Sequence, residues 1–250
     1  MSATAARPVP ATVPAAGDRT VEVRTLGTVR ADTLQARVRS VMDSSVRDVE
    51  RFWGSDWPRE IVVVLTDSDH RFVAEAGLDP RRTWTDIAAV AVADSVDPDQ
   101  RTAVGQRIVL APGAAAMSEE ALRIVLTHEL FHFAARADTA LDAPRWFVEG
   151  VADFVARKPE PIPPGAASDT ALPVDAELDS PGPRRSTGYD RAWWFSRFIA
   201  GGFGADGLRR LYRAACGPGH GDFAAAVRQS LGIDMAELQA RWVRWLAEAG

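Results

Sequence analysis

One segment of the sequence, residues 118–137, constrains the fold more than any other. Ser118 stands where a helix N-cap belongs, and Glu119 and Glu120 place negative charge in the first turn that follows. Apolar side chains then cover nearly every direction around the helix axis: Val125, Leu126, Leu130, Phe131 and Phe133. A helix that is apolar on all sides is buried rather than exposed on a surface. The sequence therefore predicts a central helix around which other elements pack.

The residues before this helix alternate between strand patterns and helical patterns. Short runs rich in β-branched and apolar residues predict strands at 20–29, 61–65, 87–92 and 107–111. Apolar residues at helical spacing predict helices at 31–53 and 67–77. Alternation of this kind favours an α/β or α+β lobe with a mixed sheet.

The chain after the central helix is predicted to be helical apart from one long loop. A helix begins at Pro144, a favoured first-turn residue, and continues to residue 157. Residues 158–187 hold seven prolines and no periodicity, which predicts a loop. Further helices are predicted at 191–199, 206–215, 222–231 and 234–249. The predicted organisation is a disordered Pro/Ala-rich tail, an α/β lobe, a Pro-rich loop and a helical lobe, at 1–19, 20–157, 158–189 and 190–250.

The central helix carries the sequence His-Glu-Leu-Phe-His at residues 128–132, which is the HExxH pattern. Residues four apart share a helix face, so the imidazoles of His128 and His132 can reach one ion while Glu129 leans toward its open side. The competing interpretation is a pair of ordinary core histidines beside an ordinary glutamate. On a helix that is apolar all round, each of these groups would need a buried partner, and a metal ion supplies one.

A zinc site needs a third protein ligand, and two carboxylates are candidates. Cys216 is the only cysteine, so the ligands have to be histidines and carboxylates. Glu149 lies on the next predicted helix. Asp138 lies six residues after His132, where some zinc peptidases place a ligand beyond a glycine that breaks the helix. Ala135 occupies that glycine position here, so the helix need not turn, and Glu149 is favoured.

The motif together with the later sequence WFVEGVAD resembles the gluzincin zinc metallopeptidases, in particular the small bacterial peptidase MA-like family. The resemblance extends from about Val21 to the C-terminus and is most specific at residues 128–132 and 149–153. It implies an α+β fold of the zincin-like kind, with a mixed β-sheet, a central HExxH helix and a small C-terminal helical lobe.

The same resemblance implies roles for individual residues. His128, His132 and Glu149 would bind Zn²⁺, with Glu129 as the general base. Asp153 would accept a hydrogen bond from a ligating histidine, and Tyr189 would donate to the developing oxyanion. The segment RIVLAP, residues 107–112, would be an edge strand that pairs with an extended substrate; the alternative is an ordinary core strand.

These assignments predict zinc-dependent hydrolysis of peptide bonds in a peptide or protein substrate. No segment resembles the motif with which exopeptidases capture a substrate amino terminus, which favours an endopeptidase or a specificity that the sequence does not reveal. Two alternatives remain: a catalytically silent binding module that keeps the zincin fold, and a metal-dependent amidohydrolase or deacetylase of small substrates. The intact Glu129 weighs against the first, because a binding module has no use for a base.

Composition and charge exclude other classes of protein. A net charge of −5 and a pI near 5.5 argue against a nucleic-acid partner, which would require a basic patch. No run of about 18 apolar residues is present, so we expect no stable membrane insertion. The opening residues lack the pattern of a signal peptide. The resemblance nevertheless favours an exported or cell-surface location, and we expect a monomer.

Overall fold

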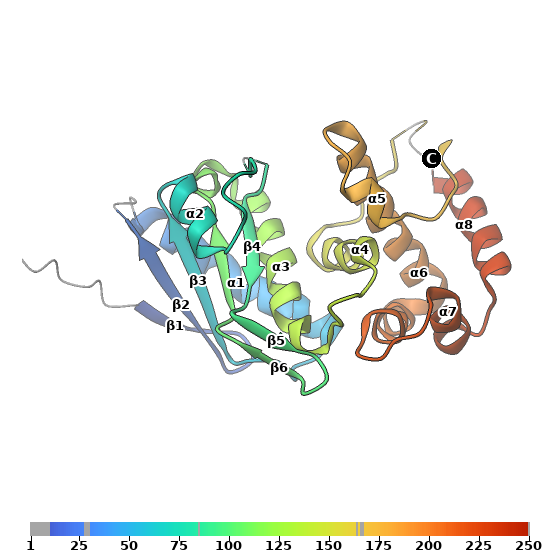
Figure 1. Ribbon diagram of the computed structural model, residues 1–250, viewed down its shortest axis with the longest axis horizontal. Coiled ribbons are helices and arrows are strands. Elements are labelled where there is room, and N and C mark those ends of the chain that lie inside the picture. The colour runs from blue at the N-terminus through green and yellow to red at the C-terminus, as the bar shows by residue number, and fades with distance from the viewer. Residues whose placement is uncertain (1–10, 28–30, 85, 164, 166–167, 250) are drawn as a thin grey trace, which may run out of the picture. The chain divides into compact units, whose positions relative to one another are not determined.

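The computed structural model describes residues 11–27, 31–84, 86–163, 165 and 168–249, which form an α+β fold (Figure 1). Its described residues belong to two compact units. The first spans residues up to 96 together with 103–134, and the second consists of 97–102 and the residues from 135 onward. The first unit contains the sheet and the second is mainly helical.

The first unit is built on a mixed sheet of five strands (Figure 1). Their order across the sheet is β1 (Ala11–Ala15), β2 (Arg19–Leu26), β3 (Glu60–Thr66), β7 (Arg107–Leu110) and β4 (Ala89–Val92). The three central strands are parallel, and β1 and β4 pair antiparallel at the two sides. Two further short strands, β5 (Ser95–Asp97) and β6 (Thr102–Val104), pair with each other.

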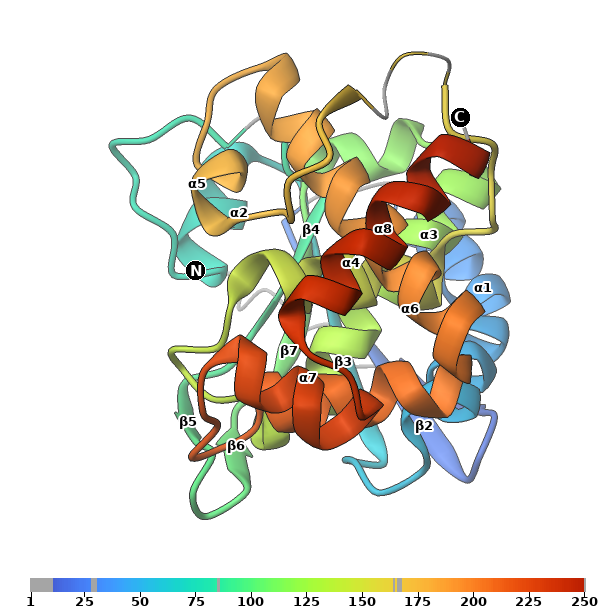
Figure 2. The same ribbon diagram turned by 90° about the vertical axis from the view of Figure 1, so that its right-hand side faces the viewer.

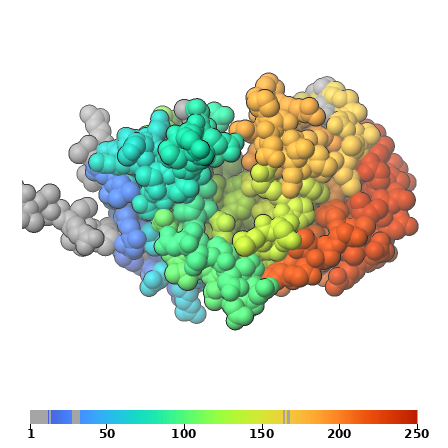
Figure 3. Space-filling view, viewed as in Figure 1, coloured from blue at the N-terminus to red at the C-terminus, as the bar shows by residue number. Residues whose placement is uncertain are grey.

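Helices cover both faces of the sheet, with α1 (Ala31–Trp53) and α2 (Asp69–Glu75) on opposite sides (Figure 2). Phe72 of α2 packs with Val64 and Val109 in a buried cluster. In the space-filling view, α2 and the segment that follows it form the teal part of the surface (Figure 3). Successive side chains of a strand point to opposite faces of the sheet. Val62 and Val64 of β3 therefore point to the face that α2 covers, and the fully buried Ile61 and Val63 point to the other face.

The predicted central helix is α3 (Glu119–Ala135), and it is held against α1. Phe131 is fully buried and meets the ring of Trp53 edge-on, with 5.7 Å between ring centroids. The hydroxyls of Thr127 and Ser45, both fully buried, are hydrogen-bonded at 2.8 Å. The Ser118 hydroxyl accepts from the N–H of Ala121, which confirms the predicted N-cap. These contacts fix the rotation of α3 about its own axis.

Among its described residues, the second unit contains a short 3₁₀ helix, η2 (Arg136–Asp138), and five α-helices (Figure 1). The α-helices are α4 (Arg145–Ala156), α5 (Asp175–Leu178), α6 (Pro183–Cys216), α7 (Phe223–Leu231) and α8 (Met235–Ala249). Within α6 the backbone breaks at Gly204, whose φ of 76° is readily adopted only by glycine. The break separates the two helices predicted at 191–199 and 206–215.

Helix α4 belongs to the second unit, although it was predicted to belong with the sheet. A Cβ atom on Gly150 would lie 2.3 Å from the carbonyl oxygen of Ala192, so α4 and α6 approach backbone to backbone. Phe147 of α4 also meets the rings of Phe195 and Phe223. The two compact units therefore divide at 134/135, with residues 97–102 in the second unit, whereas a division at residue 157 was predicted. Packing between α4 and α6 decides this boundary, and local sequence patterns carry no signal of it.

The predicted tail 1–19 is also revised, because residues 11–15 form β1 on the side of β2. A Pro/Ala-rich composition suggested a chain without regular structure, but a neighbouring strand satisfies its backbone groups. Pro14 is tolerated because β1 is an outer strand. Residues 1–10 lie outside the described part of the chain. So do 28–30, which include the end of the strand predicted at 20–29; its described part ends at Leu26.

The predicted loop 158–189 contains α5 and the first turns of α6. Arg191 of α6, which is only 2% exposed, binds several residues of this segment. Its guanidinium pairs with the carboxylates of Glu177 and Asp169 and donates to the carbonyl of Ala171. A buried arginine with several partners can order a proline-rich segment that has no apolar periodicity of its own.

The segment RIVLAP is not an edge strand, which corrects the prediction. Strand β7, at residues 107–110, lies between β3 and β4, and β4 is the outer strand on that side. Strand β4 precedes β7 in the chain, but it pairs with the side of β7 that faces away from β3. The pairing is antiparallel, with Ala89 opposite Leu110. An extended substrate therefore cannot add to the sheet at β7.

No helix in the described residues is both long and apolar enough to cross a membrane.

We predict that Gly150→Ala destabilises the metal-free protein by about 1–3 kcal/mol, because the new methyl group would overlap the carbonyl of Ala192. Gly201→Ala is the matched control. Gly201 also lies in a helix, but a Cβ there would meet nothing within 4 Å. That change should leave stability unaltered or raise it by up to about 1 kcal/mol. Urea unfolding of both variants tests the contact, and equal effects would contradict it.

We also predict that the second unit loses stability in alkali. Burial raises the pKa values of the Tyr212 phenol and the Cys216 thiol above their ordinary values of 10.0 and 9.0. As pH rises through these ordinary values, the unfolded chain releases protons that the folded chain retains. The free energy of unfolding should then fall by up to about 1.4 kcal/mol per pH unit for each group.

Urea unfolding at a series of pH values from neutral to alkaline measures this slope. Tyr212→Phe and Cys216→Ala should each flatten it, since each removes one of the two protons. A slope that is the same in both variants and in the wild type would assign the alkaline loss to other groups.

Candidate metal centre

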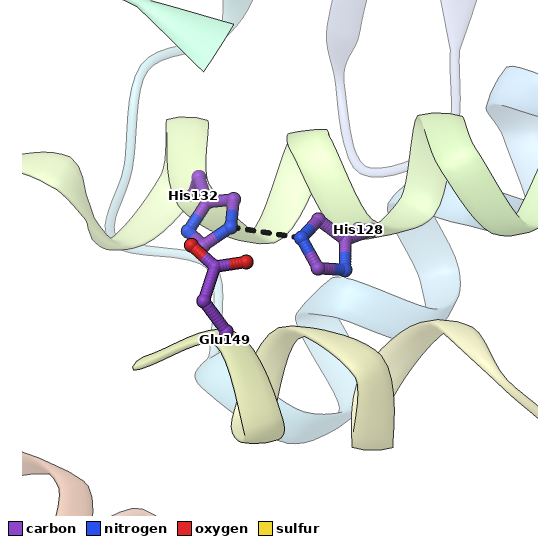
Figure 4. A group of neighbouring side chains, drawn as sticks. All are labelled: His128, His132 and Glu149. Atoms are coloured by element: carbon purple, nitrogen blue, oxygen red, sulfur yellow. Dashed lines mark hydrogen bonds between the residues drawn. The ribbon is translucent and has the colours of Figure 1, made fainter. Parts of the chain in front are cut away.

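Two imidazoles on α3 form the core of the site. His128 and His132 are four residues apart on a straight helix, so both project from one face. Their Nε2 atoms are 3.0 Å apart, and the ring centroids are 4.7 Å apart (Figure 4). Both side chains are partly buried. Thr127 and Phe131, which lie about 100° round the helix from the two histidines, fix α3 against α1 and so set the direction in which the histidines project.

A carboxylate joins the two imidazoles. Glu149 lies on α4, and its carboxylate points toward the rings (Figure 4). One ligand atom from each of His128, His132 and Glu149 can be chosen so that all three lie within 4.8 Å of one another. In the part of the chain that the structure describes, this is the one such group of three His, Cys, Asp or Glu side chains. The three side chains could therefore hold a metal ion.

Glu129 is held separately from this group. Its Oε2 atom accepts a hydrogen bond of 2.6 Å from the backbone N–H of Ala91 on β4. The residue follows His128 directly on α3 and is partly buried. Glu129 was predicted to lie beside the ion but outside the ligand set, and it is not a member of the three-residue group.

Asp138, the other candidate for a third ligand, is engaged elsewhere. It lies in η2, where its carboxylate accepts from Nε of Arg101 at 2.6 Å and from Nη2 at 3.3 Å. This two-pronged contact matches the fork of a guanidinium to the two oxygens of a carboxylate. Asp138 does not belong to the group that could hold a metal.

Relatives could indicate which ion and which reaction such a group serves. The chain matches no protein-family model and no curated protein. The chemistry of the site therefore has to be inferred from its own residues.

Asp153 and Tyr189 were predicted to support the metal group. Asp153 lies one turn after Glu149 on α4 and is buried, and its carboxylate lies 3.4 Å from the guanidinium of Arg157. Its predicted hydrogen bond to a ligating histidine stays a prediction. Tyr189 lies on α6, where burial and then the charge of Glu149 raise its pKa. The phenol of Tyr189 therefore keeps its proton at physiological pH and can act as a donor.

Two features that position these residues were missed by the sequence analysis. The first is the N–H of Ala91, which holds Glu129. It is a backbone group, and every residue except proline has one, so the residue type does not reveal it. Asp175 caps α4 from a distance of about thirty residues: its carboxylate accepts from the N–H groups of Trp146 at 2.7 Å and Arg145 at 3.2 Å. This cap lies one turn before Glu149 and fixes the start of the helix that carries it.

We predict that Glu149→Ala weakens metal binding and that Asp138→Ala does not. Loss of a directly bound carboxylate should cost more affinity than the roughly 10–100-fold typical of an outer partner. Asp138→Ala removes only the pair with Arg101. Dialysis against zinc followed by elemental analysis should give about one ion per wild-type chain. Zinc bound equally well by both variants would exclude Glu149 as a ligand, and no zinc in the wild type would exclude the site.

Proposed function

We propose that this chain is a zinc-dependent peptidase of the gluzincin type with a zincin-like fold. One observation carries the proposal: two imidazoles and a carboxylate converge, and a separate carboxylate, Glu129, stands next to one of the imidazoles in sequence. Two histidines and a glutamate are a known ligand set for catalytic zinc, with the fourth position left open.

The spacing of the ligand atoms fits zinc. Zinc–nitrogen bonds of about 2.0–2.1 Å in tetrahedral geometry place two ligand nitrogens about 3.3 Å apart. The Nε2 atoms of His128 and His132 lie 3.0 Å apart. Imidazole nitrogen and carboxylate oxygen are also the ligand types that zinc accepts when no thiolate is available.

The protein's own groups supply the proton transfers of amide hydrolysis. When bound, zinc would polarise a carbonyl and lower the pKa of a water molecule toward about 7. Glu129 accepts the proton of the attacking water and returns it to the leaving amine. Tyr189, which keeps its proton, donates a hydrogen bond to the carbonyl oxygen as negative charge develops on it. Asp153 would orient a ligating imidazole.

The substrate class in this proposal is a peptide or protein. The two alternatives are kept as outcomes of the test: a zinc-binding module without turnover, and an amidohydrolase or deacetylase acting on small substrates. The ordered carboxylate of Glu129 supports an enzyme, because a module that only binds needs no base in a fixed position.

We predict that Glu129→Gln keeps zinc but loses about 10²–10⁴-fold in kcat, as is typical when a general base is removed. The assay is digestion of a proteome-derived peptide library, read by mass spectrometry with and without a chelator. Glu119→Gln is the control, since Glu119 is an exposed glutamate on the same helix.

Cleavage by Glu129→Gln at the wild-type rate would exclude Glu129 as the base. A wild-type protein that binds zinc but cleaves no peptide would contradict the peptidase assignment. Release of acetate from acetylated amines would then identify a deacetylase, and no turnover of any substrate would identify a binding module.

A further inference from the structure

The outer strand of the sheet makes a contact with Glu129 that the proposed reaction does not by itself require. The backbone N–H of Ala91 donates to Oε2 of Glu129 at 2.6 Å. The distance is short for an N–H···O bond, as expected when the acceptor is charged. The two residues come from different elements, β4 and α3, and are 38 positions apart in sequence.

The pairing of β4 explains why this N–H is available. In an antiparallel pair, alternate residues direct their N–H and C=O groups toward the partner strand. Ala88 is in the inward phase, because its carbonyl accepts from the N–H of Ala111 at 2.9 Å. Ala89 and Ala91 are therefore in the outward phase, away from β7. Since β4 is the last described strand on its side, the N–H of Ala91 can serve a group outside the sheet.

We propose that the backbone N–H of Ala91 positions the Glu129 carboxylate for proton transfer. The inference rests on the proposed function, to which it adds a positioning residue. A glutamate side chain has several rotamers, and ordering it costs conformational entropy. The hydrogen bond to β4 selects one arrangement before any substrate arrives. The contact engages Oε2 and so restrains the orientation of the carboxylate.

The contact itself is tested without any turnover. Hydrogen exchange at the Ala91 amide is followed by NMR in metal-free protein labelled with ¹⁵N-alanine. In the wild type the amide should be protected although it faces away from β7. Glu129→Ala should speed its exchange by about tenfold or more, whereas Glu129→Gln, which keeps an acceptor oxygen, should preserve part of the protection. The Ala88 amide, which is in the inward phase, reports general opening of this edge of the sheet and should not change.

The positioning role is tested by replacing the amide of Ala91 with an ester, which removes the N–H and keeps the methyl side chain. Incorporation of lactic acid at position 91 does this, and the same replacement at Ala89 is the matched control. The ester at 91 should lower kcat by about 10- to 100-fold, with KM and zinc affinity unchanged. In the Glu129→Gln background it should cause little further loss, because the two changes act on one step.

The proposal is overturned if the esters at 91 and 89 lower kcat equally, since the effect would then be a general weakening of β4. It is also overturned if exchange at Ala91 is unaffected by Glu129→Ala. A wild-type protein without hydrolytic activity would contradict the proposed function instead. The exchange experiment alone would then decide whether the Ala91 N–H binds the Glu129 carboxylate.

Discussion

The four-residue spacing of His128 and His132 on one helix is the constraint on which the site depends. It sets the Nε2 atoms 3.0 Å apart, close to the separation of two nitrogens on one tetrahedral ion. The spacing is useful only if α3 cannot rotate. Burial of Phe131 against Trp53 and the Thr127–Ser45 hydrogen bond prevent that rotation. The side chains that bury the helix and the two imidazoles thus lie on adjoining faces of the same helix.

The two glutamates are positioned by different means. Glu129 is fixed through its side chain, by the N–H of Ala91. Glu149 is fixed through its backbone: Gly150 lets α4 approach α6 closely, and Asp175 caps the helix one turn earlier. In the proposed reaction Glu129 is the base, which needs a fixed carboxylate, and Glu149 is a ligand, which needs a fixed helix from which to reach the ion. The two kinds of support suit these two proposed roles.

Much of this could be predicted from local sequence. Helix α1 has the predicted bounds, and α8 begins with the predicted cap, in which Asp234 accepts from the N–H of Glu237. The three residues that converge were also identified, because a helical motif and a following helix restrict the options. Three non-local features could not be predicted: the placement of β4 outside β7, the pairing of β1, and the packing of α4 on α6. Each depends on contacts between distant residues that leave no periodicity in the chain.

The most direct test of the central claim is X-ray absorption at the zinc edge of the zinc-loaded protein. The account predicts scattering from two imidazole rings, with all nearest ligands nitrogen or oxygen at about 2.0–2.2 Å. The coordination number should be four or five. A spectrum without imidazole scattering, or with a sulfur ligand near 2.3 Å, would contradict a site formed by His128, His132 and Glu149.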